Sequence, residues 1–294
     1  MNTSSKQIAR FILKKHKKIC FMPYKYEMWE CMSGIYEELK KQGAKPVVMP
    51  IPYFRLKDGC IDMTGGLISD REKYRFRTKD WKKFNEYDFD CVFIHNPYDD
   101  NNTITTIHPF FYSSELKKRG CKIAYVPYFI HYGGVSTEDF RLQSGVANAD
   151  YIFVHSDQER QAYIDTYKKI GMDFSNRVFN FGSPFTDKLK KSGNNTLICT
   201  SIIAFLSNPE YKLSVYREKI ETANNPIFRP HPLMIEIINA RCPERLSEWL
   251  KLTENAPLST NKLKDDINSS NKLISDPSSV VEIWKTTGKP FEII

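Results

Sequence analysis

The sequence contains no apolar run close to the roughly 20 residues that a membrane-spanning helix requires. Its longest apolar stretches, such as residues 47–54, are short and are interrupted by proline. The first six residues are polar and do not resemble a secretory signal. These absences predict a soluble, cytoplasmic protein.

Several common site motifs are also missing. The seven cysteines are dispersed and form no CxxC pair, which argues against a disulfide framework or a zinc cluster. The absence of GxxxxGK[ST], GxGxxG and HExxH argues against P-loop kinases, ordinary dinucleotide oxidoreductases and zincins. No Asp-x-Asp motif follows a predicted strand, and the pairs Asp99-Asp100 and Asp265-Asp266 are typical of solvated turns. We therefore expect no metal and no other cofactor.

The positive charge is concentrated at one end of the chain. Residues 1–18 contain six lysines and arginines and no acidic residue, whereas the rest of the chain is nearly balanced, so we expect no nucleic-acid partner. Ile8, Phe11 and Ile12 share one side of a predicted basic amphipathic helix. Two interpretations remain open. The helix makes peripheral contact with an anionic membrane, at about 1 kcal/mol per basic residue, or it covers the first strand.

Of the 294 residues, 41% are apolar, which is enough for a core and for one large domain or two modest ones. Apolar runs alternate with segments of helical spacing. The predicted strands are residues 18–24, 47–53, 91–95, 123–129, 151–155, 178–181, 196–200, 226–229 and 273–274. The predicted helices are residues 28–39, 109–118, 157–169, 185–191, 211–222, 233–251 and 280–284. Residues 55–88 are polar and aromatic and are typical of an insertion or a long loop.

Regular strand–helix alternation predicts an α/β protein with parallel sheets covered on both faces. The polar segment 190–195 divides it into two Rossmann-like domains, residues 1–189 and 190–294, facing a central cleft. Ligands of such sheets bind beyond the carboxyl ends of the strands. Polar residues follow many of the predicted strands. In the first domain they are Lys25, His95, Asn96 and His131, and in the second Ser201, Arg229, His231, Asp276, Ser278 and Ser279.

The second-domain residues favour an anion site. Ser278 and Ser279 begin a predicted helix, where free amides and the helix dipole attract phosphate, although simple N-capping is the alternative. Arg229 and His231 follow another strand, and both side chains donate hydrogen bonds to phosphate oxygens. These four residues together predict a phosphate-binding site.

His131 is the candidate general base. Gly133 and Gly134 leave room for a ligand beside it, and an imidazole is suited to deprotonating a hydroxyl, although a loop histidine without a role is the alternative. His95 and His155 end apolar strands, and His108 precedes a helix, so structural roles are expected for all three.

These motifs resemble those of the CDP-glycerol glycerophosphotransferases, including the TagF-like enzymes that build teichoic-acid and capsule polymers. In the second half, FRPHP at 228–232 and ISDPSSVVE at 274–282 resemble the family's R-x-H and S/T-D-x-S-S turns in the same order. FGSPFTDKL at 181–189 resembles the segment that closes the family's N-terminal domain. The other matching segments are residues 21–30, 93–99 and 126–134.

The resemblance implies a GT-B fold and metal-independent transfer of a polyol phosphate, such as glycerol phosphate, from a CDP-linked donor to a hydroxyl of a polymer or lipid-linked acceptor. It makes His131 and His231 the catalytic candidates and assigns the donor phosphates to Arg229, Asp276, Ser278 and Ser279. Ser201, which follows a predicted strand of the same domain, is added to these donor-binding candidates. Lys25, His95 and Asn96 fall on the acceptor side. The sequence departs from the family at Phe129-Ile130-His131, where W-H-G is usual, and at Pro277, where tyrosine is common. A sugar-nucleotide glycosyltransferase and an inactive nucleotide- or polymer-binding homologue remain alternatives.

Overall fold

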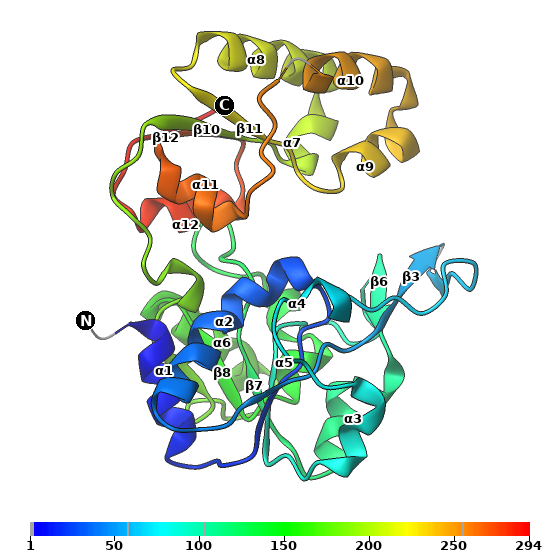
Figure 1. Ribbon diagram of the computed structural model, residues 1–294, viewed down its shortest axis with the longest axis vertical. Helices are drawn as coiled ribbons and strands as arrows, with labels where there is room; N and C mark the ends of the chain where they lie inside the picture. Colours follow the sequence, from blue (N-terminus) through cyan, green and yellow to red (C-terminus); the bar gives the residue numbers. More distant parts are fainter. Residues whose placement is uncertain (1–2, 58, 103, 255) are drawn as a thin grey trace. The chain divides into compact units, whose positions relative to one another are not determined.

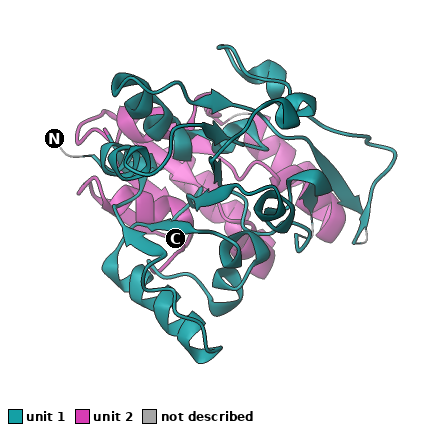
Figure 2. Cartoon of the chain, turned by 90° about the horizontal axis from the view of Figure 1, so that it is seen from below, with its two compact units in different colours: residues 1–130, 134–187 teal, residues 131–133, 188–294 magenta. Residues whose placement is uncertain are grey.

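The computed structural model describes residues 3–57, 59–102, 104–254 and 256–294. The chain forms two compact units, coloured separately in Figure 2. Unit 1 contains residues 1–130 and 134–187, and unit 2 contains residues 131–133 and 188–294. No helix in the described part of the chain is long and apolar enough to cross a membrane.

Unit 1 is built on a six-stranded parallel sheet in the order β2-β1-β5-β7-β8-β9. Its strands are β1 (Ile19–Phe21), β2 (Val47–Val48), β5 (Cys91–Ile94), β7 (Lys122–Tyr125), β8 (Tyr151–Val154) and β9 (Val178–Asn180). The central strands are buried on both faces, as expected of parallel strands covered by helices. Alternate residues of β1 and β5 therefore enter two different apolar clusters.

Helices cover both faces of this sheet (Figure 1). The first face is covered by α1 (Ser4–Leu13) and α2 (Glu30–Lys41). The second face is covered mainly by α3 (Ser113–Lys118), α5 (Ser144–Ala147) and α6 (Asp157–Lys169), and α4 (Glu138–Arg141) contacts α6. The predicted helix 157–169 is confirmed at both ends, since Ser156 caps its first turn by accepting from the amide of Glu159 at 3.1 Å.

The N-terminal helix α1 is an integral part of unit 1. Ile8 and Ile12 are fully buried and pack in the same cluster as Ile19 and Phe21 of β1, so the interpretation in which the helix covers the first strand is confirmed. Because this apolar face is buried, only charges such as that of exposed Arg10 remain available to a membrane. The membrane contact stays a prediction.

Asp187 holds the start of α1. Its two carboxylate oxygens accept hydrogen bonds from the amides of Ser4 and Ser5, at 3.0 and 2.8 Å. A carboxylate at this position satisfies amides that the helix leaves without partners and complements the helix dipole. The aspartate of the FGSPFTDKL motif thus joins the two ends of unit 1.

The segment between β2 and β7 contains an antiparallel sheet that the sequence did not predict. Residues 55–88, predicted as an insertion or a long loop, hold β4 and part of β3, which form with β6 a sheet in the order β4-β3-β6, and several 3-10 turns lie in the same segment. The strands are β3 (Tyr53–Lys57), β4 (Cys60–Ile61) and β6 (Thr105–Ile107). The 3-10 turns of unit 1 are Tyr26–Trp29, Arg71–Lys73, Trp81–Glu86, Pro109–Phe111 and Pro184–Thr186. The last replaces the helix predicted at 185–191, where Lys188 adopts a left-handed φ of 65°.

Unit 2 contains a four-stranded parallel sheet in the order β11-β10-β12-β13. Its strands are β10 (Asn195–Cys199), β11 (Pro226–Arg229), β12 (Ser270–Ser275) and β13 (Phe291–Ile293). One face packs on α7 (Ile202–Ser207), α8 (Pro209–Thr222), α9 (Met234–Arg241) and α10 (Leu246–Glu254). The remaining helices are α11 (Leu263–Ser269) and α12 (Ser279–Lys285). The single helix predicted at 233–251 is wrong, because a 3-10 turn, Pro243–Arg245, separates α9 from α10.

Candidate functional site

The polar turns of unit 2 meet at the carboxyl ends of three adjacent parallel strands. β10 lies between β11 and β12, and two hydrogen bonds join the turns that follow them. The amide of Ser201 donates to Oδ2 of Asp276 at 2.8 Å, and the amide of His231 donates to Oγ1 of Thr200 at 3.0 Å. Segments far apart in the sequence therefore form one polar edge.

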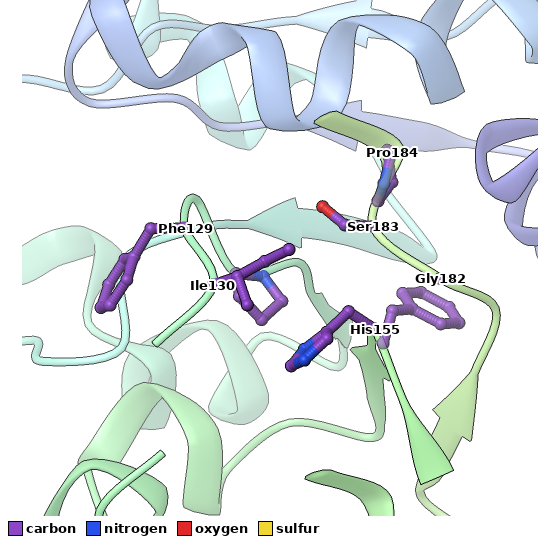
Figure 3. Close-up of a pocket in the computed structure, with 8 residues that line it drawn as sticks. Phe129, Ile130, His155, Gly182, Ser183 and Pro184 are labelled. Atoms are coloured by element: carbon purple, nitrogen blue, oxygen red, sulfur yellow. The ribbon is translucent and has the colours of Figure 1, made fainter. Parts of the chain in front are cut away.

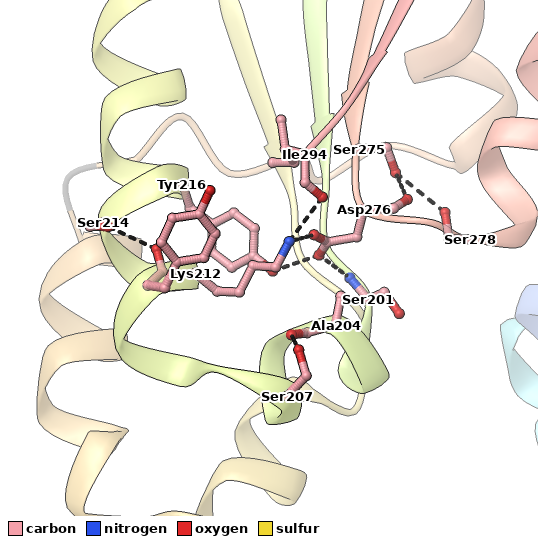
Figure 4. A network of polar contacts seen from close by, with 11 residues as sticks. Ser201, Ala204, Ser207, Lys212, Ser214, Tyr216, Ser275, Asp276, Ser278 and Ile294 are labelled. Carbon is pink, nitrogen blue, oxygen red and sulfur yellow. Dashed lines mark hydrogen bonds and ion pairs between the residues drawn. The ribbon is translucent and has the colours of Figure 1, made fainter.

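The carboxylate of Asp276 is fully buried and has several partners within unit 2 (Figure 4). Oδ1 lies 2.7 Å from Nζ of Lys212, and Oδ2 accepts from the hydroxyl of Tyr216 at 2.5 Å. Burial, together with the hydrogen bond to Asp276, raises the pKa of Tyr216 far above its usual value. Asp276 thus fixes the turn after β12 against α8, and its carboxylate faces protein groups.

Arg229 is held in a similar way. Its Nη1 lies 2.8 Å from Oδ2 of Asp266 and also donates to the carbonyl of Asn261 at 2.8 Å and to Oγ of Ser259 at 3.3 Å. Asp266 is fully buried, so its prediction as part of a solvated turn is wrong. The Arg229 side chain is 26% exposed, and its hydrogen bonds to described residues all use Nη1. Nε and Nη2 are therefore the groups that a ligand phosphate could reach.

His231 presents one defined hydrogen-bond donor. Its Nδ1 accepts the amide of Leu233 at 3.2 Å, so the neutral ring carries its proton on Nε2. Burial lowers the pKa of His231, which favours this neutral form. The half-buried ring therefore offers an Nε2–H that can donate to a phosphate oxygen without first being protonated.

Ser278 occupies the N-cap position of α12, but its side chain makes no capping hydrogen bond. Its Oγ lies 3.3 Å from Oγ of Ser275, and Ser279 begins the helix. Side-chain capping of the helix, the alternative to a phosphate-binding role, is therefore not observed for Ser278.

The loop His131–Gly133 belongs to unit 2. The amide of Gly133 donates to Oε1 of Glu282 at 3.1 Å, and Nζ of Lys285 lies 5.9 Å from the ring centre of Tyr132. Gly133 and Gly134 have φ values of 85° and 79°, a conformation that favours glycine. Glu282 ends the ISDPSSVVE segment and was not among the site residues predicted from the sequence. The role of His131 as a base stays a prediction.

In unit 1, His95 follows β5 and is fully buried. Its Nε2 accepts the amide of Tyr24 at 3.3 Å, and the two rings stack with centres 5.2 Å apart. Burial, with the charge of Lys25 as a smaller cause, lowers the pKa of His95 to about 3. Such a ring is neutral near pH 7 and too weakly basic to be an effective general base there.

The other two acceptor-side candidates have structural contacts as well. Oδ1 of Asn96 accepts the amide of Tyr98 at 3.3 Å, and the Asn96 side chain is buried. Nζ of Lys25 lies 5.4 and 5.7 Å from the ring centres of Tyr24 and Tyr53. All three candidates follow the adjacent strands β1 and β5, so the structure brings them to one edge of the sheet.

A pocket lies at the carboxyl ends of β7, β8 and β9 (Figure 3). Its cavity volume is about 10 Å³, room for about one water molecule, and it is lined by Pro127, Phe129, Ile130, Phe153, His155, Gly182, Ser183 and Pro184. The position of His155 at the end of an apolar strand had predicted a structural role for it. No local signal showed that the turns after three strands would surround one cavity.

Within the described residues, no group of three or more His, Cys, Asp and Glu side chains is arranged to hold a metal ion. All seven cysteines are free thiols, and only Cys60 among them is exposed. The expectation of a reaction without metal stays a prediction.

No protein-family model matches the chain, and no curated protein sequence matches it. Solved structures do share its fold. The MnaA–UDP complex of S. aureus gives a TM-score of 0.56 at 12% identity, covering 94% of this chain and 79% of that chain. The wall teichoic acid polymerase TagF, as a variant soaked with CDPG, gives a TM-score of 0.55 at 12% identity, covering 99% of this chain and 74% of that chain. UDP-GlcNAc 2-epimerase of Methanocaldococcus jannaschii, in complex with UDP-GlcNAc and UDP, gives a TM-score of 0.53 at 12% identity, covering 93% of this chain and 82% of that chain.

These similarities show the fold. The chain is an α/β protein of the GT-B class, with a parallel sheet in each unit, and this prediction is confirmed. TagF and epimerases occur together among the structural neighbours, so the fold alone does not choose between transfer and epimerisation.

Proposed function

We propose that the chain transfers a polyol phosphate, glycerol phosphate in the first instance, from a CDP-linked donor to a hydroxyl acceptor and releases CMP. One observation carries this proposal. The FRPHP and ISDPSSVVE turns, which resemble those of CDP-glycerol glycerophosphotransferases, lie at the ends of the two strands that flank β10. A TagF structure among the fold neighbours supports the same class.

In the proposed reaction, the acceptor oxygen attacks the phosphorus that carries the polyol. The bond from that phosphorus to the bridging oxygen breaks, CMP leaves with the electron pair, and the acceptor proton passes to a base. The Nε2–H of His231 and the outer N–H groups of Arg229 would donate to the phosphates as charge moves onto CMP. We assign the base to His131, so His131→Ala should lower turnover by about 10²- to 10⁴-fold.

A second candidate is an enzyme acting on a UDP-sugar. The neighbours solved with UDP or UDP-GlcNAc favour it, because they share the fold at similar TM-scores. This candidate includes the sugar-nucleotide glycosyltransferase that the sequence left as an alternative, and the other alternative is an inactive homologue that binds a nucleotide or a polymer.

Calorimetric titration with CDP, CMP, UDP and GDP separates these candidates. Preference for cytidine nucleotides, followed by CMP release from CDP-glycerol in the presence of excess EDTA, would support the proposal. Preference for UDP or GDP would favour a sugar-nucleotide enzyme, and failure to bind any nucleotide would favour an accessory role. Loss of turnover in EDTA with rescue by Mg²⁺ would contradict the metal-independent mechanism.

A further inference from the structure

The loop that carries His131 belongs to unit 2, although the chain on both sides of it belongs to unit 1. The chain enters unit 2 after Ile130 and returns to unit 1 at Gly134. At the return, Gly133 and Gly134 have φ values of 85° and 79°. Glycine adopts this conformation without strain, but it also loses more conformational freedom than any other residue when a loop is fixed. The loop therefore needs a contact outside its own backbone to hold His131 in one place.

Glu282 of α12 supplies a contact of this kind. Its Oε1 accepts the amide of Gly133 at 3.1 Å and lies 2.8 Å from Nζ of Lys285. The Glu282 side chain is only 10% exposed, whereas that of Lys285 is 45% exposed. A hydrogen bond from an amide to a carboxylate is stronger than one between neutral groups, and partial removal from water strengthens it further. Glu282 is therefore well suited to fix the loop at Gly133.

The helix that carries Glu282 is itself firmly held in unit 2. Ile283 and Trp284, which follow Glu282 in α12, are buried. Nε1 of Trp284 donates to the carbonyls of Lys289 and Pro290, both at 3.1 Å. Side chains placed by packed helices are positioned more precisely than those placed by loops. The bond to Glu282 thus gives the loop a fixed point of attachment.

The same helix also begins at the proposed donor site. Ser278 and Ser279, which the resemblance assigns to the donor phosphates, precede Glu282 by about one helical turn. In the proposed transfer, the base and the donor must be held at a defined separation, because a misplacement of about 1 Å can lower the rate by about 100-fold. One helix therefore carries both a donor contact and the attachment of the His131 loop.

We infer that Glu282 is a positioning residue, which holds the His131 loop on α12 and so aligns the base for the proposed transfer. The inference rests on the proposed function, because that function assigns the base to His131. It deepens the proposal by naming the side chain that places the base. In this role Glu282 exchanges no proton with the acceptor, and its whole effect on turnover passes through His131.

Substitutions of Glu282 test this role in turnover. Glu282→Ala removes the acceptor for Gly133, so kcat for CMP release from CDP-glycerol should fall by about 10- to 100-fold. Glu282→Gln keeps an acceptor oxygen and should restore most of kcat. The affinity for CDP, measured by calorimetry, should change little in both variants. Glu236→Ala is the matched control, because Glu236 is an exposed glutamate in the first turn of α9, and it should leave kcat unchanged.

Three results of these measurements would overturn the inference. The first is wild-type kcat in Glu282→Ala, and the second is a loss in Glu282→Gln as large as that in Glu282→Ala. The third is a fall in CDP affinity that matches the fall in kcat, because it would place Glu282 in the donor site itself.

A double variant separates positioning from a general structural effect. In the His131→Ala background, Glu282→Ala should cause no further fall in kcat, because the base that Glu282 places is already absent. If Glu282 instead supported the fold of α12, the two losses would multiply. A multiplied loss therefore contradicts the positioning role, and circular dichroism checks that each variant is folded.

NMR relaxation tests the attachment of the loop without turnover. In the ¹⁵N-labelled full chain, the backbone order parameters of Tyr132 and Gly133 should fall in Glu282→Ala to below about 0.6, the range of flexible backbone. Glu282→Gln and Glu236→Ala should keep the wild-type values. Unchanged order parameters in Glu282→Ala would exclude an anchoring role for Glu282.

Failure of this inference can be distinguished from failure of the proposed function. If no CMP is released from CDP-glycerol but the loop loosens in Glu282→Ala, the transfer proposal fails and the anchoring by Glu282 stands. If CMP release depends on His131 while Glu282→Ala is as active as the wild type, the transfer proposal stands and this inference fails. Wild-type turnover in His131→Ala would overturn both the assignment of the base and the positioning role.

Discussion

The ammonium group of Lys212 lies 2.7 Å from Oδ1 of Asp276, and the exposed fractions of the two side chains are only 9% and 0%. Lys212 also donates to the carbonyl of Ile294 at 2.9 Å. This ion pair fastens α8 to the turn after β12, one of the turns that form the candidate donor site (Figure 4). Both charges have lost most of their hydration. Removing either side chain would therefore leave the other charge buried without a partner, which destabilises the folded protein.

Lys212→Met should therefore destabilise the protein strongly. The variant leaves the Asp276 carboxylate buried without its cation, which costs about 3–5 kcal/mol in comparable cases. The free energy of unfolding from urea titration measures the loss. Lys219→Met is the control on the same helix, because Lys219 pairs with the partly exposed Glu292 and its loss should matter much less. Equal losses for the two variants would contradict the importance of the buried pair.

Asp187→Ala should loosen the N-terminal helix. The substitution removes the acceptor for the amides of Ser4 and Ser5, and loss of such a cap costs about 0.5–2 kcal/mol. Amide exchange should accelerate in α1 more than in α6, and the free energy of unfolding should fall. Asp187→Asn keeps one acceptor, so its amide exchange in α1 and its free energy of unfolding should lie between those of the wild type and those of Asp187→Ala. Unchanged exchange in α1 for Asp187→Ala would rule out this anchoring role.

Local patterns predicted much of the fold. Helix 157–169 was predictable because Ser156 provides an N-cap and the helical spacing continues to the end of α6. The predicted helix 233–251 failed because its apolar spacing continues through Pro243, which cannot donate a backbone hydrogen bond. The strands β6 and β13 are too short to give a clear periodic signal.

The candidate site was only partly predictable, for a physical reason. Strand-end turns are local features, and they correctly located Arg229, His231 and Asp276 at one edge of a sheet. The partners of these side chains come from distant segments, as Asp266 does for Arg229 and Lys212 does for Asp276. Their burial therefore depends on tertiary packing, which no nearby residue reveals.

Asp99 should make stability depend on pH. The Asp99 carboxyl is buried and accepts the amide and the hydroxyl of Ser113, and burial raises its pKa to about 6. The unfolded value is near 3.9. Between these two pKa values the folded protein binds more protons than the unfolded chain does. The contribution of Asp99 to the free energy of unfolding is therefore fully present below about pH 4 and is lost as the pH rises through 6.

Asp99→Asn should remove this dependence. Asparagine keeps an acceptor for Ser113 and tolerates the φ of 50° at this position. Relative to the wild type, the variant should gain about 3 kcal/mol of stability between pH 4 and pH 7.5, as a two-unit shift implies. Unfolding by urea at both pH values checks this, with exposed Asp100→Asn as the control. Parallel pH profiles for wild type and Asp99→Asn would contradict the assignment.

His231→Asn should separate donor binding from folding. An asparagine Oδ1 can replace Nδ1 as acceptor for the amide of Leu233, but asparagine places no donor where Nε2–H lies. The affinity for CDP should fall by about 10- to 150-fold, the value of one hydrogen bond to a charged group, while the free energy of unfolding changes little.

His231→Phe should lose both affinity and stability, because it also removes the acceptor for the amide of Leu233. Calorimetry and urea unfolding of the two variants give both quantities. Wild-type CDP affinity in a folded His231→Asn variant would exclude His231 from the donor site. Arg229→Ala is a poorer test, since it also leaves Asp266 buried without its cation.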